Sequence, residues 1–284
     1  MPLCFVTAIE RGAFTHTLHL DISESYTFSK LGYDTEPFDD ALTRRLHAIR
    51  KQALDEVKAL DASLGIAQVA TIAKLMPFGI LASMGSLSAV APSFARVLEA
   101  KIDDSGAAES YSVLKTVCAT EQICVGIRQN FGRGSIIDNP DKNENNETLE
   151  ETEAATDDAS KKAGDETEAN NMVWILAPNI KGGIAALEFA VAENESAATF
   201  IYRFEGSFEH FTRSFNRAIE AVAFKREVIR LSDTELRKPE YSEYAMAVNR
   251  NTSLQFIRSC FSGRVIHSSP ERWKQGLLKF MNEH

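Results

Sequence analysis

The sequence predicts an α+β protein: an N-terminal β-hairpin and helices, then an antiparallel sheet interrupted by a disordered acidic loop, then a helical C-terminus. Three observations predict it. Apolar and polar residues alternate in several short segments, apolar residues recur every three or four positions in others, and a long acidic segment divides the β-forming region. The predicted elements fall into two parts, a hairpin and helical region at 1–110 and a sheet with C-terminal helices at 111–284.

The first 22 residues predict a β-hairpin. Residues 3–9 are apolar and β-forming, residues 10–12 provide a turn, and residues 14–22 alternate. In this second strand His16 falls on the apolar face and His19 on the polar face, so the two imidazoles cannot bind one metal ion. We expect one core histidine and one surface histidine.

A long amphipathic helix follows the hairpin. Apolar residues recur at spacings of three and four from Phe38 to Leu64, which defines one face of an α-helix. Pro37 suits the first helical turn and Gly65 suits the end of the helix. The sequence therefore predicts a helix that begins near residue 35 and stops at Gly65.

The segment 75–95 has no charged residue, and its length would suffice to span a bilayer. It also contains two prolines, two glycines and four serines, which makes it only moderately apolar. The composition favours a buried helix or helix pair, broken near Pro77, over a membrane span. A peripheral membrane contact through 75–95 is a further alternative, and one more helix is predicted at 93–102.

The β-forming pattern resumes after residue 110. Paired strands are predicted at 112–117 and 122–129, and later strands at 173–176, 185–192 and 197–204. Ser112 and Lys115 match the S-x-x-K motif of serine-lysine enzymes, which depends on a helical turn to bring the two side chains together. In a strand these positions face opposite ways, so we interpret the match as coincidental.

The segment 138–171 carries the net charge of the chain. It holds twelve acidic and three basic residues, a net charge of −9, whereas the other 250 residues hold 28 of each. It has no aromatic and no β-branched aliphatic residue, so it is predicted to be disordered. It could link two domains, 1–137 and 172–284, or form a loop inserted in one sheet. Strand patterns on both sides favour the inserted loop.

Helices are predicted for the C-terminal third. Ser207 suits the N-cap of an amphipathic helix, and Ser232 with Glu235 forms a capping-box pattern. Helical patterns continue at 241–248 and 253–261, with Gly263 as a stop, and a last helix runs from Pro270 to about residue 281.

Composition narrows the classes of function. The parts that flank the acidic segment are nearly neutral, unlike a strongly basic nucleic-acid-binding domain. No signal peptide is visible at the N-terminus, so a cytoplasmic protein with reduced cysteines is expected. Cys118 and Cys124 lack the spacing of a zinc knuckle, and buried thiols are favoured over a redox pair or a metal site. No catalytic residue, metal ligand or cofactor is predicted.

One region is clearly positive: residues 250–279 contain six basic residues and one acid, with aromatic residues between them. The candidate binding residues on this C-terminal basic and aromatic face are Arg258, Arg264, His267, Arg272, Trp273 and Lys274. The start of the last helix could receive an anion, although helix capping and core packing also explain its residues.

The sequence thus predicts a cytoplasmic, non-enzymatic binding or regulatory protein whose partner, an anionic ligand or a protein, contacts the C-terminal face. Nucleic acid and membrane are less favoured as partners. A further hypothesis is that the acidic segment shields this face, as opposed to being a soluble spacer. The alternatives are an enzyme whose site is assembled only in the fold and a peripheral membrane-associated protein.

Overall fold

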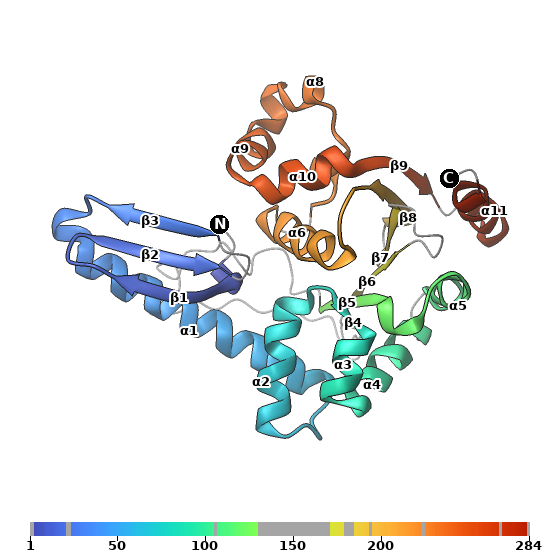
Figure 1. The fold of residues 1–284 in the computed structure, drawn as a ribbon, viewed down its shortest axis with the longest axis horizontal. Helices are drawn as coiled ribbons and strands as arrows, with labels where there is room; N and C mark the ends of the chain where they lie inside the picture. Colours follow the sequence, from blue (N-terminus) through green and yellow to red (C-terminus); the bar gives the residue numbers. More distant parts are fainter. Residues whose placement is uncertain are drawn as a thin grey trace, which may run out of the picture.

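The computed structural model of the chain contains two antiparallel sheets and the helices that pack on them (Figure 1). The residues it describes are 3–20, 24–104, 107–129, 171–178, 185–192, 195–222, 225–266 and 269–282. The α+β prediction is therefore confirmed. The predicted disorder of 138–171 lies outside the described residues, apart from Asn171, which begins a strand.

The smaller sheet contains β1 (Val6–Arg11), β2 (Thr15–Leu20) and β3 (Ser25–Ser29), in that order. The predicted hairpin is confirmed, and β3 adds a strand that we did not predict. His16 is 3% exposed and faces the core, while His19 lies on the outer face, as the alternation predicts. This sheet projects from the body of the molecule (Figure 1).

The long helix α1 (Thr35–Leu60) connects the smaller sheet to the body. Its Leu42 and Leu46 pack against that sheet, and its last turns join the main core. The helix ends five residues before Gly65, so the predicted stop at Gly65 is wrong. Gly65 instead is the extended N-cap residue of α2 (Ile66–Leu75), and its N–H donates to Gln68 Oε1 at 3.1 Å.

The uncharged segment 75–95 belongs to the core. It includes β4 (Ala82–Ser83), α3 (Met84–Val90) and the start of α4 (Pro92–Asp103). Its large apolar side chains that are buried include Met76, Ile80, Leu81, Met84, Leu87 and Phe94. The predicted buried helices interrupted near Pro77 are confirmed. Within the described segments, no helix is both long and apolar enough to cross a bilayer.

Residues 108–117 form a helix, α5 (Ala108–Val117), and the predicted strand at 112–117 is wrong. Tyr111, Leu114 and Cys118 are buried and recur every three or four residues, so tertiary burial with helical periodicity outweighs the β preference of Tyr, Val and Thr. Ser112 and Lys115 of the S-x-x-K match therefore do not face opposite ways in a strand, as the strand prediction implied. Ser112 and Lys115 do lie one helical turn apart, but both are exposed.

The larger sheet has six antiparallel strands in the order β4-β5-β6-β7-β8-β9. The strands after β4 are β5 (Cys124–Gln129), β6 (Asn171–Pro178), β7 (Ala185–Ala192), β8 (Glu195–Arg203) and β9 (Phe261–Ile266). Gln129 and Asn171 are Cα partners in the β5–β6 pair, so the acidic segment lies between adjacent strands of one sheet. The inserted-loop interpretation is confirmed. The helix predicted at 253–261 ends at Cys260, before Gly263 as expected, but Gly263 itself pairs with Ile201 within β9, a strand that the sequence pattern does not predict.

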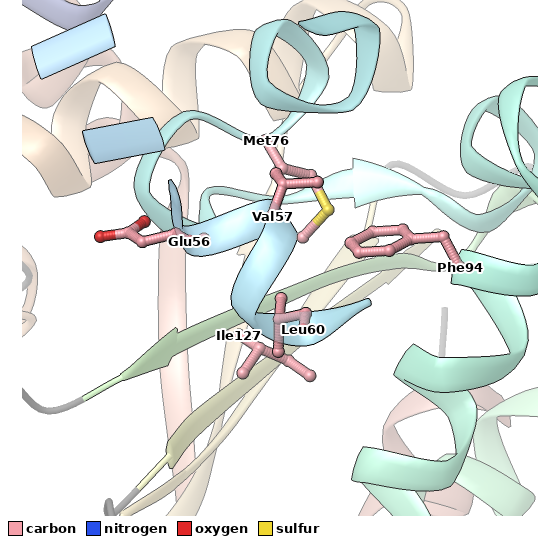
Figure 2. A pocket seen from close by; sticks show the side chains of 7 residues that line it. Glu56, Val57, Leu60, Met76, Phe94 and Ile127 are labelled. Atoms are coloured by element: carbon pink, nitrogen blue, oxygen red, sulfur yellow. The ribbon is translucent and has the colours of Figure 1, made fainter. Parts of the chain in front are cut away.

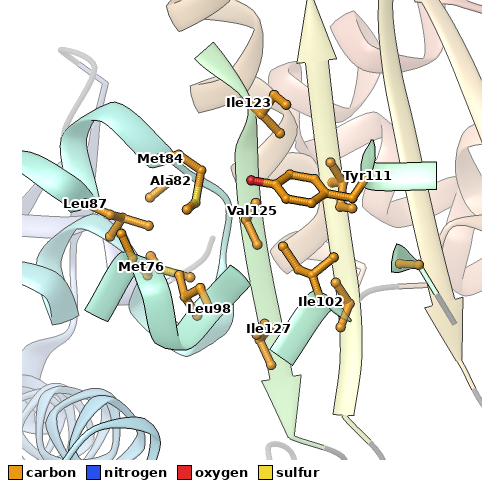
Figure 3. Packing of buried hydrophobic residues seen from close by; sticks show 14 of the residues in the cluster. Met76, Ala82, Met84, Leu87, Leu98, Ile102, Tyr111, Ile123, Val125 and Ile127 are labelled. Atoms are coloured by element: carbon orange, nitrogen blue, oxygen red, sulfur yellow. The ribbon is translucent and has the colours of Figure 1, made fainter. Parts of the chain in front are cut away.

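Helices cover both faces of the larger sheet (Figure 1). One face packs against α2 to α5 and α11, as Figure 3 shows for the side chains around Val125 and Ile127 of β5. The other face packs against α6 and α10. Because both faces are covered, consecutive residues of β6 are buried from Val173 to Ala177.

The C-terminal helices are largely as predicted. They are α6 (Phe208–Ala221), α7 (Glu227–Arg230), α8 (Asp233–Leu236), α9 (Ser242–Arg250), α10 (Thr252–Cys260) and α11 (Pro270–Asn282). The Ser207 cap and the Ser232–Glu235 capping box are both present. Short 3-10 helices link the elements: η1 (Leu3–Phe5), η2 (Gly32–Asp34), η3 (Pro77–Gly79), η4 (Thr120–Gln122) and η6 (Pro239–Tyr241).

Glu24 fixes the smaller sheet to the helices of the body. Its Oε2 accepts a bond of 2.6 Å from Nη1 of Arg217 on α6, and its Oε1 accepts from Thr252 at the start of α10 at 3.1 Å. The Arg217 side chain is 2% exposed, so its charge requires a carboxylate partner. The ion pair therefore ties the residue before β3 to α6 and α10.

Candidate functional site

Arg258, one of the six candidate binding residues, acts within the fold. Its Nη2 donates to Asp233 Oδ1 at 2.9 Å, and its Nη1 donates to the backbone carbonyl of Val228. The Arg258 side chain is 11% exposed. These bonds hold α10 against α7 and the start of α8, so the guanidinium is largely engaged by the protein itself.

Trp273 lies in the core and not on the surface. It is 3% exposed, and its Nε1–H donates to Thr199 Oγ1 of β8 at 2.7 Å. Leu277, one turn later, is also buried. The indole therefore fastens α11 to one face of the larger sheet, which matches the alternative of helix capping and core packing at this helix start.

Arg264 lies on the other face of the same sheet. Cross-strand partners point to the same face, and Arg264 is the Cα partner of Phe200, which belongs to the core under α6 and α10. The neighbouring pair, Val265 with Thr199, faces α11. Strand β9, the last strand of the sheet, thus separates the Arg264 side chain from α11.

Arg272 and Lys274 are exposed on α11, on either side of the buried Trp273. Neither makes an ion pair with any residue in the described parts of the chain, and the same holds for Arg264. His267 lies outside the described residues. The structure therefore leaves three cations exposed: Arg264 of β9 on the sheet face under α6 and α10, and Arg272 and Lys274 on α11, which packs on the other face.

A buried charged cluster lies on the sheet face beneath α6 and α10, and the sequence patterns do not predict it. Glu188 of β7 is 0% exposed. Its Oε2 accepts from the Tyr202 hydroxyl at 2.8 Å, and its Oε1 accepts from Arg226 Nη1 at 3.2 Å. The Arg226 guanidinium also lies over the rings of Trp174 and Phe200, at 4.9 and 5.3 Å from their centroids.

Burial sets the protonation preferences of this cluster. It raises the pKa of Glu188, and the Arg226 charge and the Tyr202 hydroxyl offset part of that rise. Burial and the adjacent Glu188 raise the pKa of Tyr202 well above its ordinary value. Both oxygens of the carboxylate have protein donors, so the cluster is a self-satisfied network that joins β7, β8 and the segment after α6.

One signal for this cluster exists in the sequence. Glu188 stands between Leu187 and Phe189 in a strand, where alternation assigns it to a solvent-facing side. The sheet is covered on both faces, so that side is interior. A lone carboxylate on such a strand requires a buried donor, but nothing local identifies Arg226, 38 residues later, as that donor.

A small apolar cavity lies between α1, η3 and β5 (Figure 2). Its volume is about 20 Å³, which is the space of about one water molecule. Val57, Leu60, Met76, Phe94 and Ile127 line it, and the Glu56 carboxylate points away from them (Figure 2). The cavity has neither the size nor the polar groups of a metabolite site.

The three buried cysteines, Cys118, Cys124 and Cys260, have thiols that resist ionisation. Burial raises the pKa of the Cys118 thiol to about 11 and that of Cys124 to about 12, which disfavours the reactive thiolate. In the described segments, no three His, Cys, Asp or Glu side chains are grouped closely enough to hold a metal ion. Cys118 and Cys124 are both buried, as predicted.

Compared with known proteins, the chain matches no family model, no curated protein and no solved structure.

Proposed function

We propose that the chain is a non-enzymatic binding or regulatory protein that holds an anionic partner along the β9 edge. The supporting observation is the set of three exposed cations, Arg264, Arg272 and Lys274, for which the described residues provide no carboxylate. Arginines elsewhere in the body, such as Arg217 and Arg226, have their charge neutralised within the fold. Cations left free at the surface are available to a partner.

The charge balance distinguishes this region from the exposed basic residues of α1. Residues 250–279 hold six basic residues and one acid, and with Arg258, which pairs with Asp233, set aside, their net charge is +4. Residues 39–58 hold five basic residues and four acids, a net charge of +1, because pairs of acids flank the central basic residues. The α1 surface therefore attracts an anion less strongly over the distance at which charges act in physiological salt.

The geometry also limits the shape of the partner. Arg264 and α11 lie on opposite faces of the sheet, so one flat surface cannot cover all three cations. A partner that lies along the β9 edge reaches both sides. An acidic protein segment in an extended conformation fits this arrangement, whereas a duplex nucleic acid would require a broad basic face.

The test compares two triple variants with the same change in charge. One replaces Arg264, Arg272 and Lys274 by Ser, and the control replaces Arg44, Arg50 and Lys51 of α1, which are also exposed, by Ser. Binding of polyglutamate and of heparin is measured at several salt concentrations. We expect the first variant to bind about tenfold more weakly, with a shallower salt dependence, and the control to bind like the wild type. Equal losses in both variants would refute a site at β9.

The shielding hypothesis has its own test. The acidic residues of 138–171 carry a net charge of −9 on the same chain as these cations. If they compete for the β9 edge, replacing them with neutral residues strengthens polyglutamate binding and steepens its salt dependence. If these acidic residues are only a spacer, the affinity for polyglutamate and its salt dependence both stay the same. The proposed binding at β9 would then stand, but the acidic segment would not regulate it.

The enzymatic alternative rests on the buried cluster around Glu188. Raised pKa values of a carboxyl group and a phenol in one place are typical of catalytic sites as well as of structural networks. Here the carboxylate is fully buried and both its oxygens are occupied, which favours the structural role. The third alternative, membrane contact through 75–95, would require side chains that the core already buries, and binding to anionic-lipid vesicles tests it.

A further inference from the structure

The edges of the two sheets differ in how they are protected against pairing with another strand. An unprotected edge exposes a row of backbone N–H and C=O groups, and proteins block such edges with charged residues, bulges or very short strands. The edge strand β1 carries Glu10 and Arg11 and a bulge near Ala8. At the larger sheet, β4 has two residues, and β9 carries Arg264 and a register shift.

The remaining edge strand, β3, has none of these devices. Its sequence is Ser25-Tyr26-Thr27-Phe28-Ser29, without a charge, a proline or a glycine, and aromatic and hydroxyl residues of this kind favour strands. Among the described strands it pairs with β2 alone. Ser25, Thr27 and Ser29 are exposed, and Tyr26 and Phe28 are half-buried on the face toward α1. No described strand pairs with the outer edge of β3, so among the described residues this edge is open and suited to pairing.

The β3 sequence is also symmetric about Thr27. Serine stands at both ends, an aromatic residue on each side of the centre, and threonine at the centre. An interface between two identical chains on a twofold axis requires a surface that complements itself. If β3 pairs antiparallel with β3 of a second copy about Thr27, Tyr26 of one chain faces Phe28 of the other and Ser25 faces Ser29.

The central cross-strand pairs of this arrangement are favourable. Aromatic pairs and threonine pairs stabilise antiparallel strands. The structure already contains such a threonine pair, because the Thr17 and Thr27 hydroxyl oxygens lie 3.1 Å apart across β2 and β3. Pairing about Thr27 would continue this hydroxyl row into the second chain, and it would cover the half-buried Tyr26 and Phe28 rings.

We propose that the chain forms a homodimer by antiparallel pairing of β3 with β3 of a second copy, which joins the two smaller sheets into one six-stranded sheet. The symmetry of β3 favours a second copy over an unrelated strand, which would not require a symmetric sequence. The contact is small, so the dimer is weak and reversible. The proposal does not depend on the anionic partner, because β3 and β9 belong to different sheets.

Sedimentation equilibrium of the full chain tests the proposal. We expect the average mass to rise from 31.4 kDa toward twice that value as the concentration increases through the micromolar range. Thr27→Lys places two like charges opposite each other at the twofold axis, and it should weaken dimerisation at least tenfold. Ala8→Lys adds the same charge to the same outer face on the far strand β1, and it should leave dimerisation unchanged.

Mixing two variants separates pairing from damage to β3. Thr27→Lys and Thr27→Glu should each be monomeric alone and form a dimer when mixed, because their charges then attract. Mild oxidation of Thr27→Cys should give a disulfide-linked dimer, whereas Ser25→Cys should cross-link only when mixed with Ser29→Cys. A wild-type chain that stays monomeric, a dimer that tolerates Thr27→Lys, or mixtures that stay monomeric would overturn the proposal.

Discussion

The side-chain amide of Asn216 pairs with the backbone of Leu81 as a neighbouring strand would. Asn216 Oδ1 accepts from the Leu81 N–H at 3.2 Å, and Nδ2 donates to the Leu81 carbonyl at 2.9 Å. Leu81 immediately precedes the short edge strand β4, so α6 supplies the two bonds that no further strand provides. One side chain thereby fastens a helix from residue 216 to a segment 135 residues earlier.

Replacing Asn216 by Ala should lower the free energy of unfolding by about 2 kcal/mol, because the buried Leu81 N–H and C=O lose their partners. Urea unfolding followed by circular dichroism measures the change. Asn249→Ala on α9 is the matched control, since Asn249 is exposed, and it should change stability by less than about 0.5 kcal/mol. Similar values for the two variants would show that the Asn216 pair contributes nothing.

Gly126 should not tolerate a side chain. A Cβ atom there would lie 2.3 Å from the Gly79 carbonyl oxygen, which is a backbone atom that cannot rotate away. We expect Gly126→Ala to destabilise the protein by more than about 2 kcal/mol, because β5 and η3 must separate. Gly263→Ala in β9, where a Cβ meets nothing within 4 Å, is the control for adding the same methyl group. Equal midpoints in thermal unfolding would contradict the close approach.

The elements that the sequence predicts well are those whose local pattern agrees with their burial. The α6 stripe of Phe211, Phe215 and Ile219 carries a 3.6-residue period, and the structure buries all three. For α5 the two signals conflict, since Tyr111 and Val113 favour strands while the burial of Tyr111 and Leu114 has the helical period. Where strand preference and helical periodicity conflict, tertiary packing determines which secondary structure forms. A single sequence does not show which segments will pack together.

The candidate site shows a second limit. A composition count can find a basic region, but it cannot separate a cation that serves the fold from one that is free. Arg258 and Arg264 are both arginines in the same stretch, and Asp233 and Val228 engage the first while no described carboxylate engages the second. Trp273 has the same ambiguity, because burial against Thr199 depends on how α11 meets β8.

Trp273 and Thr199 should be energetically coupled. Trp273→Phe removes the N–H donor, and Thr199→Val removes the acceptor while keeping the shape of the side chain. Each change should destabilise the protein, and the double-mutant cycle should give a coupling energy of about 1 kcal/mol. Because the indole is buried, Trp273→Phe should leave the affinity for polyglutamate unchanged. If Trp273→Phe kept its stability but no longer bound polyglutamate, Trp273 would instead contact the partner directly.

The buried Glu188 should make stability depend on pH in a defined direction. Burial raises its pKa in the folded protein above the ordinary value of 4.5, so between these two values the folded chain binds more protons than the unfolded chain. The stability contributed by this group is therefore fully present below about pH 4.5, and it is lost as the pH rises through the folded-state pKa. The substituted side chain of the Glu188→Gln variant stays neutral at every pH, and its amide oxygen can still accept from Tyr202 or Arg226.

We expect the unfolding free energy of Glu188→Gln, relative to the wild type, to increase from pH 4.5 to pH 8 in urea titrations. The exposed Glu243→Gln should give a difference that is nearly constant over this range, and a constant difference for Glu188→Gln as well would contradict the raised pKa.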